Sequence, residues 1–148
     1  MYSRILVPLD GSKTAQRGLD EAIRLAAALK SKLHLLHVID DFPMLMEMSV
    51  VSNFETTLNE LRAYAKKMLA DAVTRASEAG VPSDTSLREV VQERIAGVIV
   101  DEAGKAGCDL IVMGTHGRRG IGRVALGSDA ENVLRTSPVP VLLVRSAS

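Results

Sequence analysis

The chain has 148 residues, and its 18 basic and 18 acidic side chains give a formal charge of zero. This balance excludes a global electrostatic attraction to nucleic acid or to a membrane surface. Two tyrosines, two phenylalanines and no tryptophan also argue against a surface on which the bases of single-stranded nucleic acid would stack.

Short apolar stretches alternate along the chain with longer amphipathic ones. Apolar runs of this length predict buried strands, and they cover residues 4–9, 33–39, 109–113 and 139–144. Residues 85–91 mix polar and apolar side chains, which favours an edge strand. Pro140 places the last run at a strand start or at a sheet edge.

The stretches between these runs carry apolar side chains at helical spacing, in residues 19–29, 58–72 and 95–103. Gly80, followed by Pro82, and Gly107 indicate helix ends. Strands that alternate with helices form βαβ units, whose crossovers give parallel neighbours. We therefore predict an α/β fold, with a five-stranded, mostly parallel sheet and helices on both faces.

Residues 40–53 (DDFPMLMEMSVVSN) interrupt this alternation. The segment is long for a connection between a strand and a helix, and its methionines show no helical face. A partly helical packing insert, a lid over a ligand and a methionine-rich contact surface are all compatible with it.

Cysteine content and the start of the chain bear on the cellular compartment. Cys108 is the single cysteine, so no intramolecular disulfide can form, which fits a reducing compartment. The apolar run in MYSRILVPLD is too short for a signal-peptide core or a membrane span. We expect one cytoplasmic domain, residues 1–148, with no nucleic-acid partner and no membrane insertion.

The segment GTHGRRGIGRVALGS, from Gly114 to Ser128, contains five glycines, three arginines and no acidic residue. It follows the strand predicted to end at Met113 and precedes a helix predicted to begin at Gly127–Ser128. Strand, glycine-rich loop and helix N-terminus form an arrangement that binds phosphate, because free backbone amides converge there. Arg118, Arg119 and Arg123 would add charge-assisted hydrogen bonds, so we predict an anion site.

The sequence does not match three other phosphate-binding or nucleophile motifs, and it lacks a metal-ligand cluster. The P-loop pattern lacks its first glycine, the Rossmann pattern lacks its acidic residue, and Ser128 is not in a GxSxG elbow. His34 and His37 would lie on opposite faces of one strand, and no second residue at metal-ligand spacing accompanies His116 in the sequence. No metal site is expected.

The spacing Gly114-x2-Gly117-x9-Gly127-Ser128 resembles the ATP-binding signature of the universal stress protein family. ILVPLDGS, LHLLHVID, DLIVMGTHGR and SPVPVLLVR extend the resemblance over the whole chain. The resemblance implies an adenine nucleotide alpha hydrolase-like sandwich with strand order 3-2-1-4-5. It also implies a cleft for ATP, with or without Mg²⁺, between the first and fourth strands. A homodimer is implied as well, which pairing of the last strand, from Val139 to Arg145, would form.

The resemblance assigns parts of the nucleotide to particular residues. Asp10 would hold the ribose or the adenosine end, and main-chain groups of Val38 would bind the adenine edge. The residues expected around the phosphates are Gly114, Thr115, His116, Gly117, Arg118, Arg119, Gly127 and Ser128. The expected apolar walls are Pro8, Leu9 and Met113.

Two positions depart from the family pattern. Asp129 and Ala130 stand where many ATP-binding members have an apolar residue and then a second hydroxyl. The missing hydroxyl would cost about 0.5–1.5 kcal/mol. The Asp129 carboxylate would repel phosphate unless Mg²⁺ lies between them or the side chain points away.

Structural interpretations of the same residues stay open. Ser128, with Glu131, matches a capping box, and Asp10 could cap the helix that opens near Ser12. The glycines could simply form a flexible surface loop.

We expect an ATP-binding regulator of the stress response that signals through nucleotide occupancy to an unidentified protein partner. No general base, Walker-type lysine or water-orienting arrangement is evident, so we expect no enzyme beyond slow ATP hydrolysis. The alternative is a nucleotide-independent dimeric interaction or chaperone-like module that uses the methionine-rich segment.

Overall fold

The computed structural model describes residues 1–40, 54–116 and 126–145. The strands are β1 (Arg4–Pro8), β2 (Lys32–Asp40), β3 (Ser83–Val90), β4 (Leu110–Gly114) and β5 (Val141–Val144). The helices are α1 (Lys13–Leu29), α3 (Phe54–Glu78), α4 (Ile95–Lys105) and α5 (Ser128–Thr136). The five strands form one parallel sheet in the order β3-β2-β1-β4-β5. The predicted fold class and the implied strand order are confirmed.

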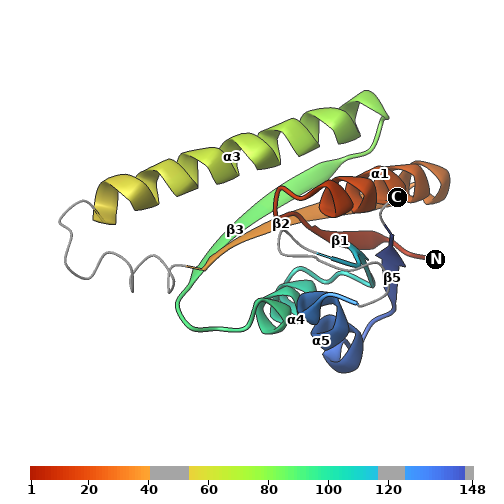
Figure 1. Cartoon of the computed structure of the whole chain (residues 1–148). Helices are drawn as coiled ribbons and strands as arrows, with labels where there is room; N and C mark the ends of the chain where they lie inside the picture. Colours follow the sequence, from red (N-terminus) through yellow and green to blue (C-terminus); the bar gives the residue numbers. More distant parts are fainter. Residues whose placement is uncertain (41–53, 117–125, 146–148) are drawn as a thin grey trace.

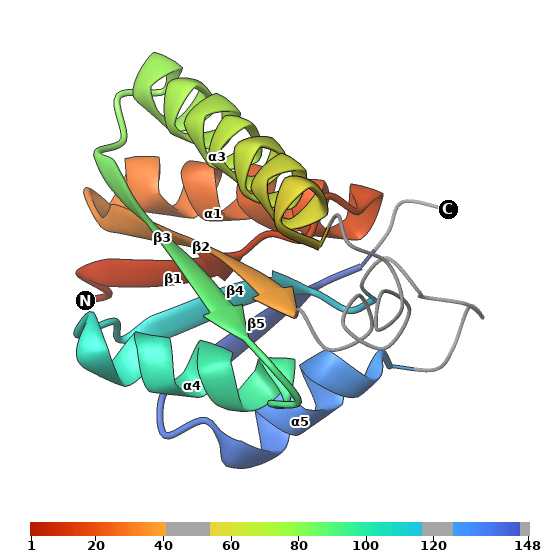
Figure 2. The ribbon, with the colours of Figure 1, turned by 90° about the vertical axis from the view of Figure 1, so that its left-hand side faces the viewer.

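The sheet separates two layers of helices. Helices α1 and α3 cover one face, and α4 and α5 cover the other (Figures 1 and 2). Alternate residues of β1 supply both cores: Ile5 and Val7 pack toward α1 and α3, whereas Leu6 packs toward α4 and α5. The central strands therefore need apolar side chains on both faces, which explains their continuous apolar runs.

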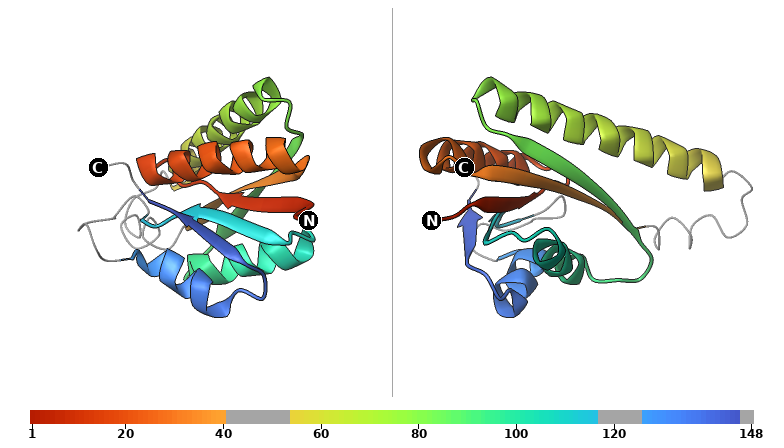
Figure 3. Two further views of the ribbon diagram at one scale, coloured as in Figure 1. Left: turned by 90° about the vertical axis from the view of Figure 1, so that its right-hand side faces the viewer. Right: turned by 180° about the vertical axis from the view of Figure 1, so that it is seen from behind.

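The two edge strands are those that the sequence indicated. β3 and β5 lie at opposite edges of the sheet (Figure 3). β5 begins at Val141, two residues later than predicted, because Pro140 has no amide hydrogen and contributes only its carbonyl, which accepts from the Ile111 amide at 3.0 Å. β3 begins at Ser83, earlier than predicted, because its partner β2 is long enough to pair with it from there.

Glycines end two of the helices as predicted. Gly80 and Gly107 have φ of 74° and 68°, the left-handed region that glycine adopts without a steric cost. Asp109, predicted to begin a strand, instead precedes β4. Its carboxylate accepts the backbone amides of Ser3 and Arg4 at 2.9–3.1 Å, which ties the start of β4 to the start of β1.

The interrupting segment joins β2 to α3. Asp40 ends β2, and Phe54 begins the 25-residue helix α3. The proposed lid and methionine-rich surface fall on residues 41–53, which lie outside the described residues. Among the helices that the structure describes, none is long and apolar enough to cross a membrane.

Candidate functional site

The order in which the chain adds strands to the sheet reverses between β1 and β4. β2 and β3 lie on one side of this pair, and β5 lies on the other. β1 and β4 are neighbours, with Ile5 opposite Leu110. After β1 the chain continues into α1 on one face, and after β4 it continues toward α5 on the other (Figure 2). In open α/β sheets a crevice forms at the carboxyl ends of strands that part in this way, and ligands bind there.

Asp10 follows the end of β1, at this carboxyl edge of the sheet. The Leu9 amide donates to the Leu36 carbonyl at 2.8 Å, and the Leu9 side chain is buried in the core beneath α1. Asp10 is half-buried, and its Oδ1 accepts from the Ser12 amide at 2.9 Å. That bond turns the chain and orients the carboxylate, so Asp10 stands at the predicted edge.

Asp10 does not cap the following helix. Ser12 is the N-cap of α1, and its hydroxyl accepts from the Ala15 amide at 3.1 Å. The capping interpretation of Asp10 is therefore wrong, because the short Ser12 side chain already reaches that amide. Ser12 and Thr14 were missed as supports of this edge, although serine before a helix is a recognisable N-cap signal.

Two neighbouring residues of β2 lie on opposite faces of the sheet near this carboxyl edge. Val38 is half-buried and packs with the core beneath α4 and α5. His37 is buried, and its Nδ1 lies 2.6 Å from the Leu9 carbonyl oxygen. The sequence suggested no role for His37 other than that of a metal ligand, and no metal site was expected there. A histidine in an apolar strand signals a buried partner, but not which one.

Gly114, at the end of β4, has a packing role. A Cβ added there would lie 2.6 Å from Thr14 Cγ2 and 2.8 Å from the Thr14 backbone carbon and oxygen. Gly18 also approaches closely, since a Cβ on it would lie 3.3 Å from the Gly114 nitrogen. These glycines let α1 pack directly against the β4 backbone, so the packing of α1 alone accounts for the glycine at position 114.

Gly114 is preceded in the chain by Met113 and followed by Thr115 and His116. Met113 is buried in the core beneath α4 and α5. Thr115 is also buried, and its amide donates to the Val144 carbonyl at 3.0 Å. Its hydroxyl lies 3.1 Å from His116 Nδ1.

A backbone hydrogen bond joins the two described ends of the glycine-rich segment. The Gly127 amide donates to the Thr115 carbonyl at 2.7 Å. A Cβ on Gly127 would lie 2.9 Å from the Thr115 oxygen and 3.2 Å from His116 Cα. The predicted ligands Gly117, Arg118 and Arg119 fall between these ends and lie outside the described residues.

Helix α5 presents its N-terminus at this position. Gly127 is the N-cap, with no capping hydrogen bond from a described side chain, and its carbonyl accepts the first helical bond from the Glu131 amide at 2.9 Å. The amides of Ser128 and Ala130 precede that bond, so they have no acceptor within the helix. Such amides, with the helix dipole, favour an anion.

The first turn of α5 differs from its predicted capping box. Ser128 is the first helical residue rather than the N-cap, so that interpretation is wrong. Ala130 is buried in the core beneath α4 and α5. Asp129 and Glu131 are exposed in this turn and place negative charge near the amides.

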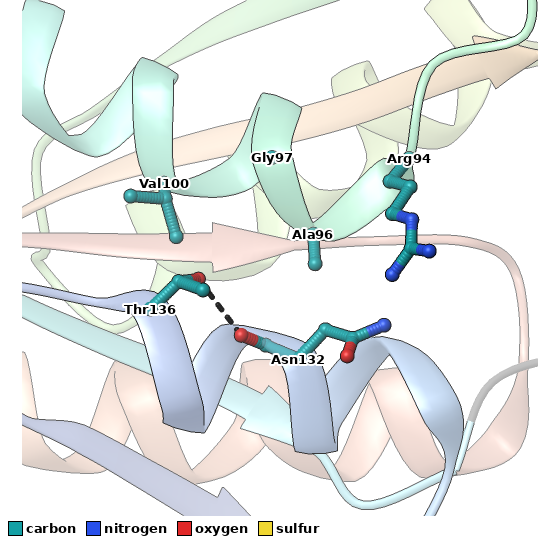
Figure 4. A pocket seen from close by; sticks show the side chains of 6 residues that line it. All are labelled: Arg94, Ala96, Gly97, Val100, Asn132 and Thr136. Carbon is teal, nitrogen blue, oxygen red and sulfur yellow. Dashed lines mark hydrogen bonds between the residues drawn. The ribbon is translucent and has the colours of Figure 1, made fainter.

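A separate cavity lies between α4 and α5. It has a volume of about 240 Å³ and is lined by Arg94, Ala96, Gly97, Val100, Asn132 and Thr136 (Figure 4). The Thr136 hydroxyl donates to the Asn132 carbonyl at 2.8 Å. None of the predicted site residues lines this cavity. In the described part of the chain, no three His, Cys, Asp or Glu side chains are grouped to bind a metal.

Comparison with known proteins identifies the family. The model of the universal stress protein family matches residues 1–145. The chain belongs to this family. A universal stress protein of Thermus aquaticus is 34% identical, covering 98% of this chain and 100% of the relative. Universal stress protein MJ0531 of Methanocaldococcus jannaschii is 32% identical, covering 98% and 83%.

Solved structures of the family share the fold. Protein MJ0577 of Methanocaldococcus jannaschii superimposes with a TM-score of 0.86 at 30% identity, covering 100% of this chain and 99% of that one. A universal stress protein solved in complex with cAMP gives a TM-score of 0.66 at 30% identity, covering 97% of each chain. A relative with this fold therefore holds an adenine nucleotide.

Proposed function

We propose that this protein binds an adenine nucleotide at the carboxyl ends of β1 and β4, and that occupancy of this site acts as a signal in the stress response. The observation that carries the proposal is the N-terminus of α5. Its amides have no helical acceptors, and the bond from Gly127 to Thr115 holds them at the strand switch point. The relative in complex with cAMP supports an adenine ligand.

We propose that the described residues would bind ATP, with or without Mg²⁺, through three groups. The Asp10 carboxylate would accept from ribose hydroxyls, and main-chain groups of Val38 would pair with the adenine edge. The amides of α5 would bind phosphate oxygens, and a side chain at Gly127 would crowd this turn. Asp129, exposed in the same turn, would oppose phosphate, and Mg²⁺ would relieve that repulsion.

Calorimetric titration with ATP, ADP, AMP and cAMP, each with Mg²⁺ and with EDTA, tests this proposal. Asp10→Asn keeps an oxygen for the Ser12 amide but removes the charge. We expect it to weaken binding about tenfold, because hydrogen bonds to charged groups contribute roughly 1.5–3 kcal/mol. Asp71→Asn, which changes an exposed carboxylate on α3, is the matched control. No binding of any of these nucleotides at millimolar concentration would refute the proposal.

We propose that the protein binds ATP without rapid turnover. Incubating the protein with Mg-ATP, denaturing it and analysing the released nucleotide tests this point. We expect the nucleotide to be recovered largely intact. Phosphate release at about 1 s⁻¹ or faster, within the range of ordinary enzymes, would contradict it.

We propose a cytoplasmic homodimer formed through β5. This strand lies at the sheet edge, and Leu142 is 39% exposed on it. An apolar edge strand is a template for pairing with another chain, and the solitary Cys108 fits a reducing compartment. We expect light scattering to give twice the chain mass and Leu142→Lys to shift the protein toward monomer. Leu134→Lys, which changes an exposed side chain of α5, should not.

A further inference from the structure

His37 connects β2 to the end of β1. Its side chain is buried, and Nδ1 lies 2.6 Å from the Leu9 carbonyl oxygen. A carbonyl only accepts, so the hydrogen is on Nδ1 and the imidazole donates. Leu9 immediately precedes Asp10, the residue predicted to hold the ribose. The imidazole therefore binds the backbone one residue before Asp10.

This contact occurs where the pairing of β1 with β2 ends. Pro8 opposite Leu36 is the last register pair, and the Leu9 amide donates to the Leu36 carbonyl at 2.8 Å. In a regular parallel ladder the Leu9 carbonyl would next accept from the Val38 amide. Instead it meets the imidazole of His37.

The contact between His37 and the Leu9 carbonyl affects what the backbone of Val38 can bind. Backbone polar groups of a strand in a sheet point alternately to its two neighbours. The Leu36 carbonyl points toward β1, so the amide and carbonyl of Val38, two residues further on, point the same way. They lie beyond the last β1 register pair, at the carboxyl edge of the sheet, where the edge of an adenine ring would need one donor and one acceptor.

We propose that His37 is a positioning residue of the nucleotide site, which holds the Leu9 carbonyl so that Val38 can pair with adenine and Asp10 can face the ribose. This inference rests on the proposed function and extends it to a residue behind the ligand. His37 does not touch the nucleotide itself, because its side chain lies on the opposite face of β2 from that of Val38.

Three variants separate the donated hydrogen bond from packing. His37→Leu replaces the imidazole with an apolar side chain of similar bulk and so removes the donor. His37→Asn places an amide nitrogen close to the position of Nδ1, whereas His37→Gln places it further out. We expect His37→Leu to weaken ATP and AMP binding about five- to tenfold, because an unsatisfied carbonyl disturbs this end of β1. His37→Asn should recover affinity to within about twofold, and His37→Gln should not.

Binding of inorganic tripolyphosphate provides the readout that a merely structural role would not alter selectively. This ligand contains phosphates but no adenosine, so the α5 amides would hold it without Val38 or Asp10. Its affinity should be the same in the wild-type protein and in His37→Leu. Unfolding temperatures of all variants are recorded alongside.

Each outcome separates the two proposals. If the wild-type protein binds no adenine nucleotide, the proposed function fails and this inference fails with it. If the wild-type protein binds ATP and His37→Leu binds it equally well, only the inference is overturned. Equal weakening of ATP and tripolyphosphate would also overturn it, since that result would indicate general loss of structure.

Discussion

The amide of Gly127 donates a 2.7 Å hydrogen bond to the carbonyl of Thr115, and this bond brings the N-terminus of α5 to the carboxyl end of β4. Space at the contact is limited, because a Cβ on Gly127 would lie 2.9 Å from the accepting oxygen. The position of the predicted phosphate site therefore depends on a residue that has no side chain.

Gly127→Ala should destabilise the protein by about 1–3 kcal/mol, because the new methyl group overlaps the Thr115 carbonyl. Thermal unfolding measures the effect. The midpoint temperature should fall by roughly 2–4 °C for each kcal/mol of stability lost in a chain of this size. Gly97→Ala is the control, since nothing lies within 4 Å of its added Cβ. It should be neutral or stabilising by up to about 1 kcal/mol. Equal stability of the wild-type protein and Gly127→Ala would contradict the prediction.

Gly114→Ala should be more damaging, by about 3 kcal/mol, because its Cβ would meet both the side chain and the backbone of Thr14. Denaturant unfolding gives the free energy. Combining it with Thr14→Ala removes the Cγ2 contact at 2.6 Å but leaves the backbone contacts at 2.8 Å. The double variant should therefore recover little stability. Full recovery would show that the side chain alone sets the spacing of α1 and β4.

A partly buried group of titratable side chains lies near the start of β2. His34 Nε2 is 2.7 Å from Glu102 Oε2, and His34 Nδ1 is 2.6 Å from Asp84 Oδ1. Arg88 also donates to Glu102, at 3.0 Å. Burial raises the pKa of Glu102, but the hydrogen bonds from His34, Arg88 and Ser86 outweigh it, so the pKa is lowered from its usual value.

A lowered carboxyl pKa in the folded state stabilises the protein above the unfolded pKa, near 4.5 for Glu102. That contribution is lost as pH falls through the folded value. Glu102→Gln should cost about 1.5–3 kcal/mol at pH 7, and its stability should converge with that of the wild-type protein well below pH 4.5. Unfolding curves from pH 7 to pH 3 test this, with Asp71→Asn as an exposed control. A difference independent of pH would contradict it.

The two serines at the starts of α1 and α5 should respond differently to truncation. Ser12→Ala removes the hydroxyl that accepts the Ala15 amide and should cost about 1 kcal/mol, the usual contribution of an N-cap. Ser128→Ala should change stability by less than about 0.5 kcal/mol, because this exposed serine caps nothing in the described structure. Denaturant midpoints compare the two. Equal losses would show that Ser128 contributes a cap after all.

Sequence patterns alone predicted the alternation of strands and helices, both edge strands, the glycine helix ends and the family. These features are local, because apolar periodicity and turn chemistry are written in neighbouring residues. The sequence also predicted that Asp10 lies at the carboxyl edge of the sheet, because the strand ends of a parallel sheet meet at one edge.

Only the tertiary structure decided why particular residues are needed at this edge. Gly114 is small because Thr14 packs against it, Gly127 because Thr115 does, and His37 is polar because the Leu9 carbonyl turns toward it. The partner in each case comes from a different element, or from the far side of a loop. Contacts of this kind depend on how the elements pack, and periodicity within one segment carries no information about them.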